Sequence, residues 1–562
     1  MNLRPALPAL LSTLLLGACA SHAASPAAPA STAINVPTVA HPQGETPAWW
    51  YRNGAARAAA NGAMQGKAKN VILFLGDGMS LTTVAAARIF DGQRKGGPGE
   101  NNLLSWENFP ATAFSHTYNT DAQVPDSAGT MTAISTGVKS YMGAISVSAA
   151  GARGDCAAAQ RDQLLTWLEL ADSAGMATGV VSTARLTHAT PAATYSHSAD
   201  RNWESDADLP PEAVADGCTD IASQLLNPRF GKGPTVLLGG GRAQFTPAAE
   251  RDPEYDDKVG LRLDGRDLVA EWKQAHPQGA YVWNRQQFEA AQEAPALFGL
   301  FEYDHMQYDH DRPQDIAGEP SLAEMTRTAI HTLQHNQDGY VLMVEGGRID
   351  HASHAGNAYR ALTDTVALSE AVQAAVDATA NRDDTLIVVT ADHSHTLTFL
   401  GYPERGNPIL GKVRGSSGEG SSHDYARDGM AQTYTTLIYG TGPGHTGATN
   451  QQPEGPKKFP HDPSDFTVSQ GRPDLSDVDT EAPDYMQEAL VPTKGETHGG
   501  DDVGIWATGP GSQAIRGSVE QNTIYHFIVQ ATPKLRQRLC DAGTCDANGV
   551  PVELPDPKAF QQ

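Results

Sequence analysis

The sequence has little positive charge. Its 562 residues contain 40 lysines and arginines against 65 aspartates and glutamates, which gives a formal net charge of −25. This balance argues against nucleic acid as a partner, because phosphate backbones need a basic surface. A phosphorylated substrate would bind only where metal ions or arginines locally reverse the field. We interpret most of the acidic side chains as a solvated surface.

Apolar runs long enough to cross a membrane are also absent. The run at residues 6–18 follows Arg4 and has the length of a secretory signal, not of a membrane span. Residues 16–19, Leu-Gly-Ala-Cys, resemble a bacterial lipoprotein box in which Cys19 receives the lipid. Residues 18–20, Ala-Cys-Ala, also fit ordinary signal cleavage, so both forms of export remain open.

The domain organisation follows from these segments and from composition. We expect residues 1–19 to be a signal peptide, of the lipoprotein type, and the Ala/Ser/Pro-rich residues 20–45 to be a flexible linker. Residues 46–562 would form one catalytic domain in the periplasm or at the cell surface, anchored to a membrane only by the N-terminal lipid. Within it, residues 401–494 are rich in Gly, Pro, Ser and Asp and predict a loop-rich, crown-like insertion.

Cysteine is scarce, and no two cysteines have the C-x-x-C spacing of a zinc site. Apart from Cys19 there are four, and an even number in an exported protein suggests two disulfides. Three pairings are possible. The short spacing favours Cys540–Cys545, which leaves Cys156–Cys218 as the second pair.

Continuous apolar runs alternate with helix-compatible stretches along the chain. "NVILFLGDG", "GYVLMVEGG" and "DTLIVVTADH" each contain such a run, and "ATGVVSTAR" and "PTVLLGGG" repeat the pattern. The alternation predicts an α/β fold with a large, mostly parallel sheet covered by helices on both faces. Functional groups in such sheets gather beyond the carboxyl ends of the strands. The residues found there are Asp77, Glu345, Asp392 and His393.

Ser127, in "VPDSAGTMTAIST", lacks the usual signs of a nucleophile. No G-x-S-x-G elbow occurs in the chain, and no histidine is close to Ser127 in sequence. Metal ligands, however, are abundant. Asp350 and His354 are four residues apart and share one face if the segment is helical, and "ETHGGDD" offers His498. Nitrogen and carboxylate ligands suit zinc, whereas an all-oxygen set suits magnesium.

These motifs together resemble the alkaline phosphatase family, and its animal-type branch in particular. The resemblance extends from about residue 47 to about residue 545 and rests on "LFLGDGMS", "PDSAGTMTAISTG", "HATPAA", "VEGGRIDHASH", "TADHSH" and "ETHGGDDV". It implies hydrolysis of small phosphate monoesters with two Zn²⁺ ions and one Mg²⁺. The first zinc would be held by Asp350, His354 and His498; the second by Asp77, Asp392, His393 and Ser127; and magnesium by Asp77, Thr190 and Glu345.

The resemblance also assigns the catalytic roles. Ser127 would form a phosphoserine, with a zinc ion in place of a histidine base. Arg201 would clamp the phosphate, and Asp126 would orient Arg201. His188 and His351 would lie next to the metals without binding them. A phosphodiesterase or sulfatase of the same superfamily, and a metal-stabilised surface protein without turnover, are the alternatives.

Two further expectations come from the animal-type pattern. One is a calcium site with oxygen ligands from Glu254, Phe301, Glu302 and Glu319. The other is a homodimer, in which a helix starting near residue 47 and carrying Trp49 and Trp50 lies outside the core and reaches the partner. A helix packed on its own monomer is the alternative.

Overall fold

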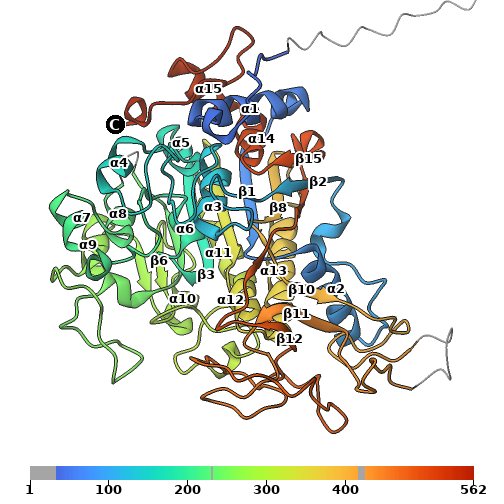
Figure 1. Ribbon diagram of the computed structural model, residues 1–562. Coiled ribbons are helices and arrows are strands. Elements are labelled where there is room, and N and C mark those ends of the chain that lie inside the picture. The colour runs from blue at the N-terminus through green and yellow to red at the C-terminus, as the bar shows by residue number, and fades with distance from the viewer. Residues whose placement is uncertain (1–32, 229–231, 416–423, 562) are drawn as a thin grey trace, which may run out of the picture. The chain divides into compact units, whose positions relative to one another are not determined.

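A sheet of ten strands lies at the centre of the computed structural model, which describes residues 33–228, 232–415 and 424–561. Strand β14 runs antiparallel to both of its neighbours, β2 and β8, and the other neighbouring strands are parallel. The predicted mostly parallel sheet is therefore confirmed (Figure 1). The strand order is β15 (Gly517–Glu520), β2 (Ala111–His116), β14 (Val503–Thr508), β8 (Thr385–Ala391), β1 (Asn70–Gly76), β7 (Tyr340–Gly346), β3 (Ala177–Arg185), β4 (Val236–Gly240), β6 (Leu297–Leu300) and β5 (Ala280–Val282).

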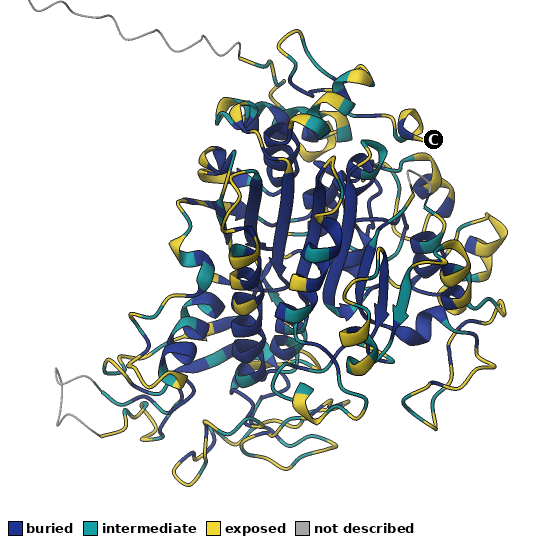
Figure 2. Ribbon diagram, turned by 180° about the vertical axis from the view of Figure 1, so that it is seen from behind, coloured by how far each residue is buried: buried dark blue, intermediate teal, exposed yellow. Residues whose placement is uncertain are grey.

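The central strands are buried on both faces. Every residue of β1, β7 and β8 is buried, as a continuous apolar run requires. Along β1, Val71 and Leu73 enter one hydrophobic cluster while Ile72 and Phe74 enter another, because successive side chains of a strand point to opposite faces. Figure 2 shows these buried strands between two layers of helices.

The helices divide between the two clusters. The cluster of Val71 and Leu73 includes residues of α1 (Pro47–Ala60), α3 (Ser127–Thr136), α5 (Trp167–Ser173), α6 (Ala189–Ala192), α8 (Ile221–Leu226), α9 (Leu268–Ala275), α14 (Thr523–Ala531) and α15 (Pro533–Asp541). The cluster of Ile72 and Phe74 includes residues of α2 (Leu81–Arg94), α10 (Arg285–Ala290), α11 (Leu322–Leu333), α12 (Arg348–His354) and α13 (Ala358–Thr379). Two short helices, α4 (Cys156–Arg161) and α7 (Pro211–Ala215), lie in a smaller cluster.

Helix α1 corrects one expectation. Trp50 and Tyr51 are buried against α14 of the same chain, where the rings of Tyr51 and His526 are 4.6 Å apart and Asn522 donates to the Trp50 carbonyl. The helix thus packs into the core of its own chain and does not lie outside it. The homodimer stays a prediction.

The described part of residues 401–494 contains the strands β11 (Leu437–Gly442) and β12 (Ala489–Pro492) and no helix. They form a small sheet with β10 (Leu397–Phe399). A second small pairing joins β9 (Ser394–His395) to β13 (His498–Gly499).

Both predicted disulfides, Cys156–Cys218 and Cys540–Cys545, are present. In the described part of the chain, no helix combines the length and apolarity needed to cross a membrane. The predicted signal peptide with Cys19, and the first part of the linker, lie outside the described residues.

Candidate active site

Ser127 is the first residue of α3 and is almost completely buried. Asp126 caps this helix, since its Oδ1 accepts from the backbone N–H of Gly129 at 3.1 Å. The Ser127 hydroxyl lies 3.1 Å from Nε2 of His393. The fold therefore brings a histidine to the serine, although none is near it in sequence.

The first group of metal-type ligands lies at the carboxyl ends of β1 and β8. Nε2 of His393 is 3.3 Å from Asp77 Oδ1 and 3.2 Å from Asp392 Oδ2. All three side chains are buried, and neither carboxylate oxygen of Asp77 has a hydrogen-bond partner. Burial, together with the charges of Asp392 and Asp350, raises the pKa of Asp77 well above its usual range. A cation between these groups would remove this cost.

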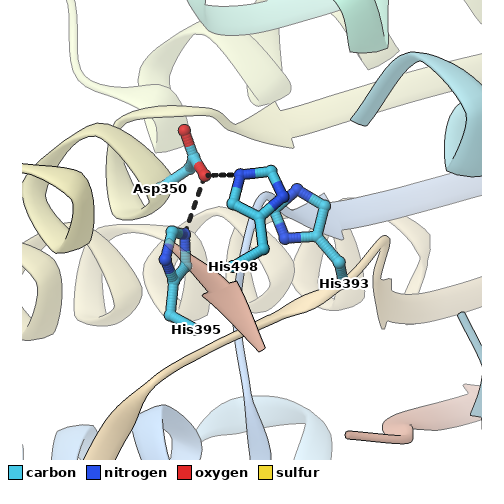
Figure 3. Close-up of side chains that lie close together, drawn as sticks. All are labelled: Asp350, His393, His395 and His498. Carbon is cyan, nitrogen blue, oxygen red and sulfur yellow. Dashed lines mark hydrogen bonds and ion pairs between the residues drawn. The ribbon is translucent and has the colours of Figure 1, made fainter. Parts of the chain in front are cut away.

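The second group is centred on Asp350, which α12 places one turn before His354. Asp350 Oδ1 lies 3.3 Å from His354 Nε2 and 3.4 Å from His498 Nε2. Figure 3 shows Asp350 and His498 pointing toward one another, with His393 beside His498. The rings of His393 and His498 are stacked, with centroids 3.6 Å apart. The two groups are therefore adjacent.

The tautomers of the three candidate histidines suit metal binding. Nδ1 of His498 lies 2.7 Å from the Pro125 carbonyl, Nδ1 of His393 lies 3.3 Å from the Ser394 carbonyl, and Nδ1 of His354 contacts the Glu496 carbonyl. A carbonyl only accepts, so each Nδ1 carries the ring hydrogen. Each neutral ring then presents the Nε2 lone pair to the carboxylates, as a metal ligand must.

His395 and Glu496 are two residues that sequence reasoning missed. Nε2 of His395 is 2.7 Å from Asp350 Oδ1, and its Nδ1 contacts Glu496 (Figure 3 shows the Asp350 contact). Burial alone would lower the pKa of His395, but the two carboxylates outweigh it and raise the pKa to about 10. Both ring nitrogens donate, so His395 orients Asp350 and has no lone pair for a metal. The second histidine of "TADHSH" was the available signal.

Burial alone would raise the pKa of the Asp350 carboxyl, but the imidazoles of His354, His395 and His498 lower it well below the usual range. Asp350 is thus an anion in the folded protein.

A group of oxygen donors borders the first one. Thr190 Oγ1 and Glu345 Oε1 are buried without partners, and Ser182 donates to the other oxygen of Glu345. Glu345 lies close to Asp77 and to the ring of His188, whose Nε2 faces Arg201. Burial raises the pKa of Glu345 to about 7. Three oxygen donors suit a hard cation such as magnesium.

Arg201 contacts the residue before the serine and one of the histidines near the candidate metal ligands. Its Nη1 donates to Asp126 Oδ2 at 3.1 Å, as expected, and its Nη2 donates to His188 Nε2 at 3.1 Å. Burial would raise the pKa of Asp126, but Arg201 and the N–H groups of Gly129 and Gly143 lower it. The Arg201–Asp126 pair sets a fixed cation beside Ser127.

A separate acidic group contains the predicted calcium ligands. Glu302 accepts from Tyr255 at 2.6 Å, and Glu319 accepts from the Gln307 N–H at 2.9 Å. Glu254 Oε1 and Glu319 Oε2 are buried without partners, and so is Oδ2 of Asp315, which sequence reasoning missed. Phe301 directly precedes Glu302 and is buried. Asp315 stands in the segment between Glu302 and Glu319, and its acidity was the only signal.

Comparisons with known proteins identify the family of this chain. The sequence profile described as "Alkaline phosphatase" matches residues 68–533. The chain is 42% identical over 473 residues to the rat tissue-nonspecific isozyme of alkaline phosphatase, covering 83% of this chain and 84% of that protein. It is 43% identical over 477 residues to the chicken tissue-nonspecific isozyme, covering 83% and 85%.

Solved structures confirm the fold. The Thermus thermophilus alkaline phosphatase superposes with a TM-score of 0.58 at 24% identity, over 84% of this chain and 92% of the other. The enzyme from the Antarctic bacterium TAB5 gives 0.54 at 20% identity, over 83% and 99%.

Buried carboxylates and imidazoles around a hydroxyl, on an α/β sheet, are typical of a metal-dependent hydrolase. With the profile match and the 42% identity, the chain belongs to the alkaline phosphatase family. It is an enzyme that hydrolyses phosphate monoesters.

Proposed function

We propose that Ser127 accepts the phosphoryl group from the monoester and forms a phosphoserine intermediate. The observation that carries this proposal is the position of its hydroxyl, buried at the start of α3 and 3.1 Å from His393. The positive end of α3 favours negative charge at this oxygen. Ser127 attacks phosphorus, the bond to the alcohol oxygen breaks, and water then hydrolyses the phosphoserine to inorganic phosphate.

The donor sets fit the two zinc ions and one magnesium ion of the sequence interpretation. Zinc suits the mixed imidazole and carboxylate groups, and magnesium suits the group of oxygen donors. When bound, these metals lower the pKa of coordinated hydroxyl groups and neutralise phosphate charge. The proposed ligand sets are Asp77, Asp392, His393 and Ser127; Asp350, His354 and His498; and Asp77, Thr190 and Glu345. The grouping of Asp77 with Asp392 and His393, and of Asp77 with Glu345, supports them.

Arg201 binds two phosphate oxygens through its planar fork, held in place by Asp126. His188 keeps the other side of the guanidinium in position, since its Nε2 accepts from Nη2. Neither histidine next to the metals, His188 or His351, is proposed as a ligand.

We also propose calcium at the group of Glu254, Glu302, Asp315 and Glu319, with the Phe301 carbonyl. Buried carboxylate oxygens without partners support it. The ion would tie separate loops together and take no part in the reaction.

Export, lipidation at Cys19 and a homodimer complete the proposal. Two disulfides support an oxidising compartment. Cys19→Ser should move the protein from the membrane fraction to the supernatant. The dimer rests on the resemblance to animal-type enzymes, and sedimentation at micromolar concentration decides it.

The function is tested by assaying a phosphate monoester, a phosphate diester and a sulfate ester with the same metal-loaded preparation. The monoester should be hydrolysed fastest by a wide margin. A preference for the diester or the sulfate would assign the site to a different branch of the superfamily, and no turnover of any ester would favour a binding protein.

A further inference from the structure

The backbone of Arg201 is held in place as well as its side chain. The Arg201 N–H donates to the Gly143 carbonyl at 2.9 Å. The carboxylate of the preceding residue, Asp200, accepts from the N–H of Asn202 at 2.9 Å. An aspartate that bonds the N–H two residues further on closes a local turn, and Arg201 is the residue inside this turn. The direction in which the Arg201 side chain leaves the backbone therefore depends on the Asp200 carboxylate.

Arg153 holds that carboxylate. Its Nε donates to Asp200 Oδ2 at 2.9 Å, and its Nη2 donates to Asp200 Oδ1 at 2.8 Å, which makes the pair bidentate. The Arg153 side chain is 42% exposed and that of Asp200 is 18% exposed, and an ion pair near the surface contributes little to stability. The contribution of this pair is therefore geometric, because two parallel bonds from a planar guanidinium fix the orientation of the carboxylate.

Arg153 also covers the residue that joins Arg201 to Asp126. Gly143 accepts from the Arg201 N–H, and its own N–H donates to Asp126 Oδ2 at 3.0 Å. The φ of Gly143 is +86°, and a Cβ at this position would lie 2.6 Å from Nε of Arg153, so only glycine fits here. The hydrogen bonds to Asp200 raise the pKa of Arg153 against the opposing effect of burial, and the charge of Asp126 adds to the rise. Arg153 thus acts on both groups that hold Arg201.

The loop that carries Arg153 is anchored beside the Arg201 segment. The Gly154 N–H donates to the Ala199 carbonyl at 3.2 Å. Helix α4 begins at Cys156, and the disulfide Cys156–Cys218 links its first residue to the segment that follows α7. Arg153 therefore approaches its partner from a part of the chain that is fixed on both sides.

We propose that Arg153 is a positioning residue for phosphate binding, which keeps the Arg201 guanidinium directed at the substrate by holding the Asp200 carboxylate. This inference rests on the proposed function, because it requires Arg201 to be the phosphate clamp. Without Arg153 the carboxylate can rotate and the turn around Arg201 loosens, so the two-point contact with phosphate is formed less often. The loss should appear in phosphate binding and not in the stability of the fold.

The test measures the inhibition constant of inorganic phosphate, together with kcat and KM for p-nitrophenyl phosphate, on the metal-loaded enzyme. Arg153→Gln should raise the inhibition constant and KM about fivefold, with a smaller change in kcat and an unchanged Tm. Arg153→Lys keeps the charge but cannot form two parallel bonds, so it should restore only part of the loss. Arg161→Gln is the matched control, because Arg161, the last residue of α4, makes the same kind of bidentate contact with Asp162. It should leave all three constants unchanged.

A double-mutant cycle shows whether Arg153 acts through Arg201. Arg201→Ala should weaken phosphate inhibition more than Arg153→Gln does. Adding Arg153→Gln to Arg201→Ala should cause no further change, because the group that Arg153 positions is already absent.

Three results would overturn the inference. An unchanged inhibition constant in Arg153→Gln would show that Arg201 does not depend on this pair. Full recovery in Arg153→Lys, or the same fivefold effect in the Arg201→Ala background, would make Arg153 an independent charge and not a positioning residue.

Failure of the proposed function would look different. If Arg201→Ala itself left phosphate inhibition unchanged, Arg201 would not be the phosphate clamp, and the inference would fall with that assignment. Should Arg153→Gln not fold, Asp200→Asn weakens the same pair from the other side and should give the same shift in the inhibition constant.

Discussion

Two groups of buried acids differ in what surrounds them. Around Asp77 and Asp350, imidazole nitrogens and the Ser127 hydroxyl lie among the carboxylates. Around Glu254 and Glu319, the unpartnered donors are carboxylate oxygens alone. Both groups hold buried oxygens without hydrogen-bond partners, and a bound cation would compensate the cost of burying them.

The difference assigns different roles to the two groups. Mixed nitrogen and oxygen ligands favour zinc, which activates a hydroxyl, and the first group contains one. An oxygen-only set favours a hard cation, whose binding to the folded state alone increases stability. Changes in the first group should therefore affect catalysis, and changes in the second should affect unfolding.

The largest effect is expected from Ser127→Ala. Activity should fall by about 10³-fold or more, because the acceptor of the phosphoryl group is lost. Quenching with labelled substrate should trap phosphate on Ser127 in the unmutated enzyme and on no residue in the variant. Ser135→Ala, which removes a buried hydroxyl without a partner from the same helix, is the matched control and should keep its activity. Label on another residue would refute the mechanism.

A smaller catalytic effect is expected from His395→Asn. Since His395 orients Asp350, zinc affinity and activity should fall about 10–100-fold. Added zinc should restore much of the activity, which would not happen if the substitution only damaged the fold. Titration with zinc while activity is recorded measures both. Unchanged zinc affinity would show that His395 is not a positioning residue.

Much of this architecture could be predicted from the sequence. Continuous apolar runs identify buried parallel strands independently of the conformation of the connecting loops. Asp77 and Asp392 directly follow such runs. The four-residue spacing of Asp350 and His354 was enough to place them on one face of α12. Such features depend on residues that are close in sequence, so they can be predicted without knowledge of the tertiary structure.

Contacts between distant segments could not be predicted in this way. Ser127 and His393 are 266 residues apart, and Glu496 meets His395 only because β9 pairs with β13. Asp315 reaches the acidic group because of the path of the loop between Glu302 and Glu319. The amino-acid composition of that loop does not predict its path. The sequence of α1 predicts a surface helix, and only the structure shows that it packs on α14.

Removal of calcium should change stability with little change in activity. With zinc and magnesium held constant, stripping calcium should lower Tm by a few degrees and restoring it should reverse the change, because the ion binds only the folded chain. Glu319→Gln should abolish the response, whereas Glu250→Gln, at an exposed glutamate outside the group, should preserve it. A Tm that does not respond to calcium in the unmutated enzyme would rule the site out.

The smallest effect concerns the pH dependence of that calcium-free stability. Burial raises the pKa of Glu254 from 4.5 to about 7, with Glu302 and Asp315 adding to the rise and Arg242 opposing it. Between pH 4.5 and about 7 the folded chain binds more protons at Glu254 than the unfolded chain does. The contribution of Glu254 to the free energy of unfolding is therefore complete below the unfolded pKa and is lost as pH rises through the folded pKa. Bound calcium compensates the carboxylate charge and should remove this fall. Thermal melting of the calcium-free enzyme and of Glu254→Gln across this range measures the effect: the difference in Tm between them should change with pH, and a constant difference would mean that Glu254 has an ordinary pKa.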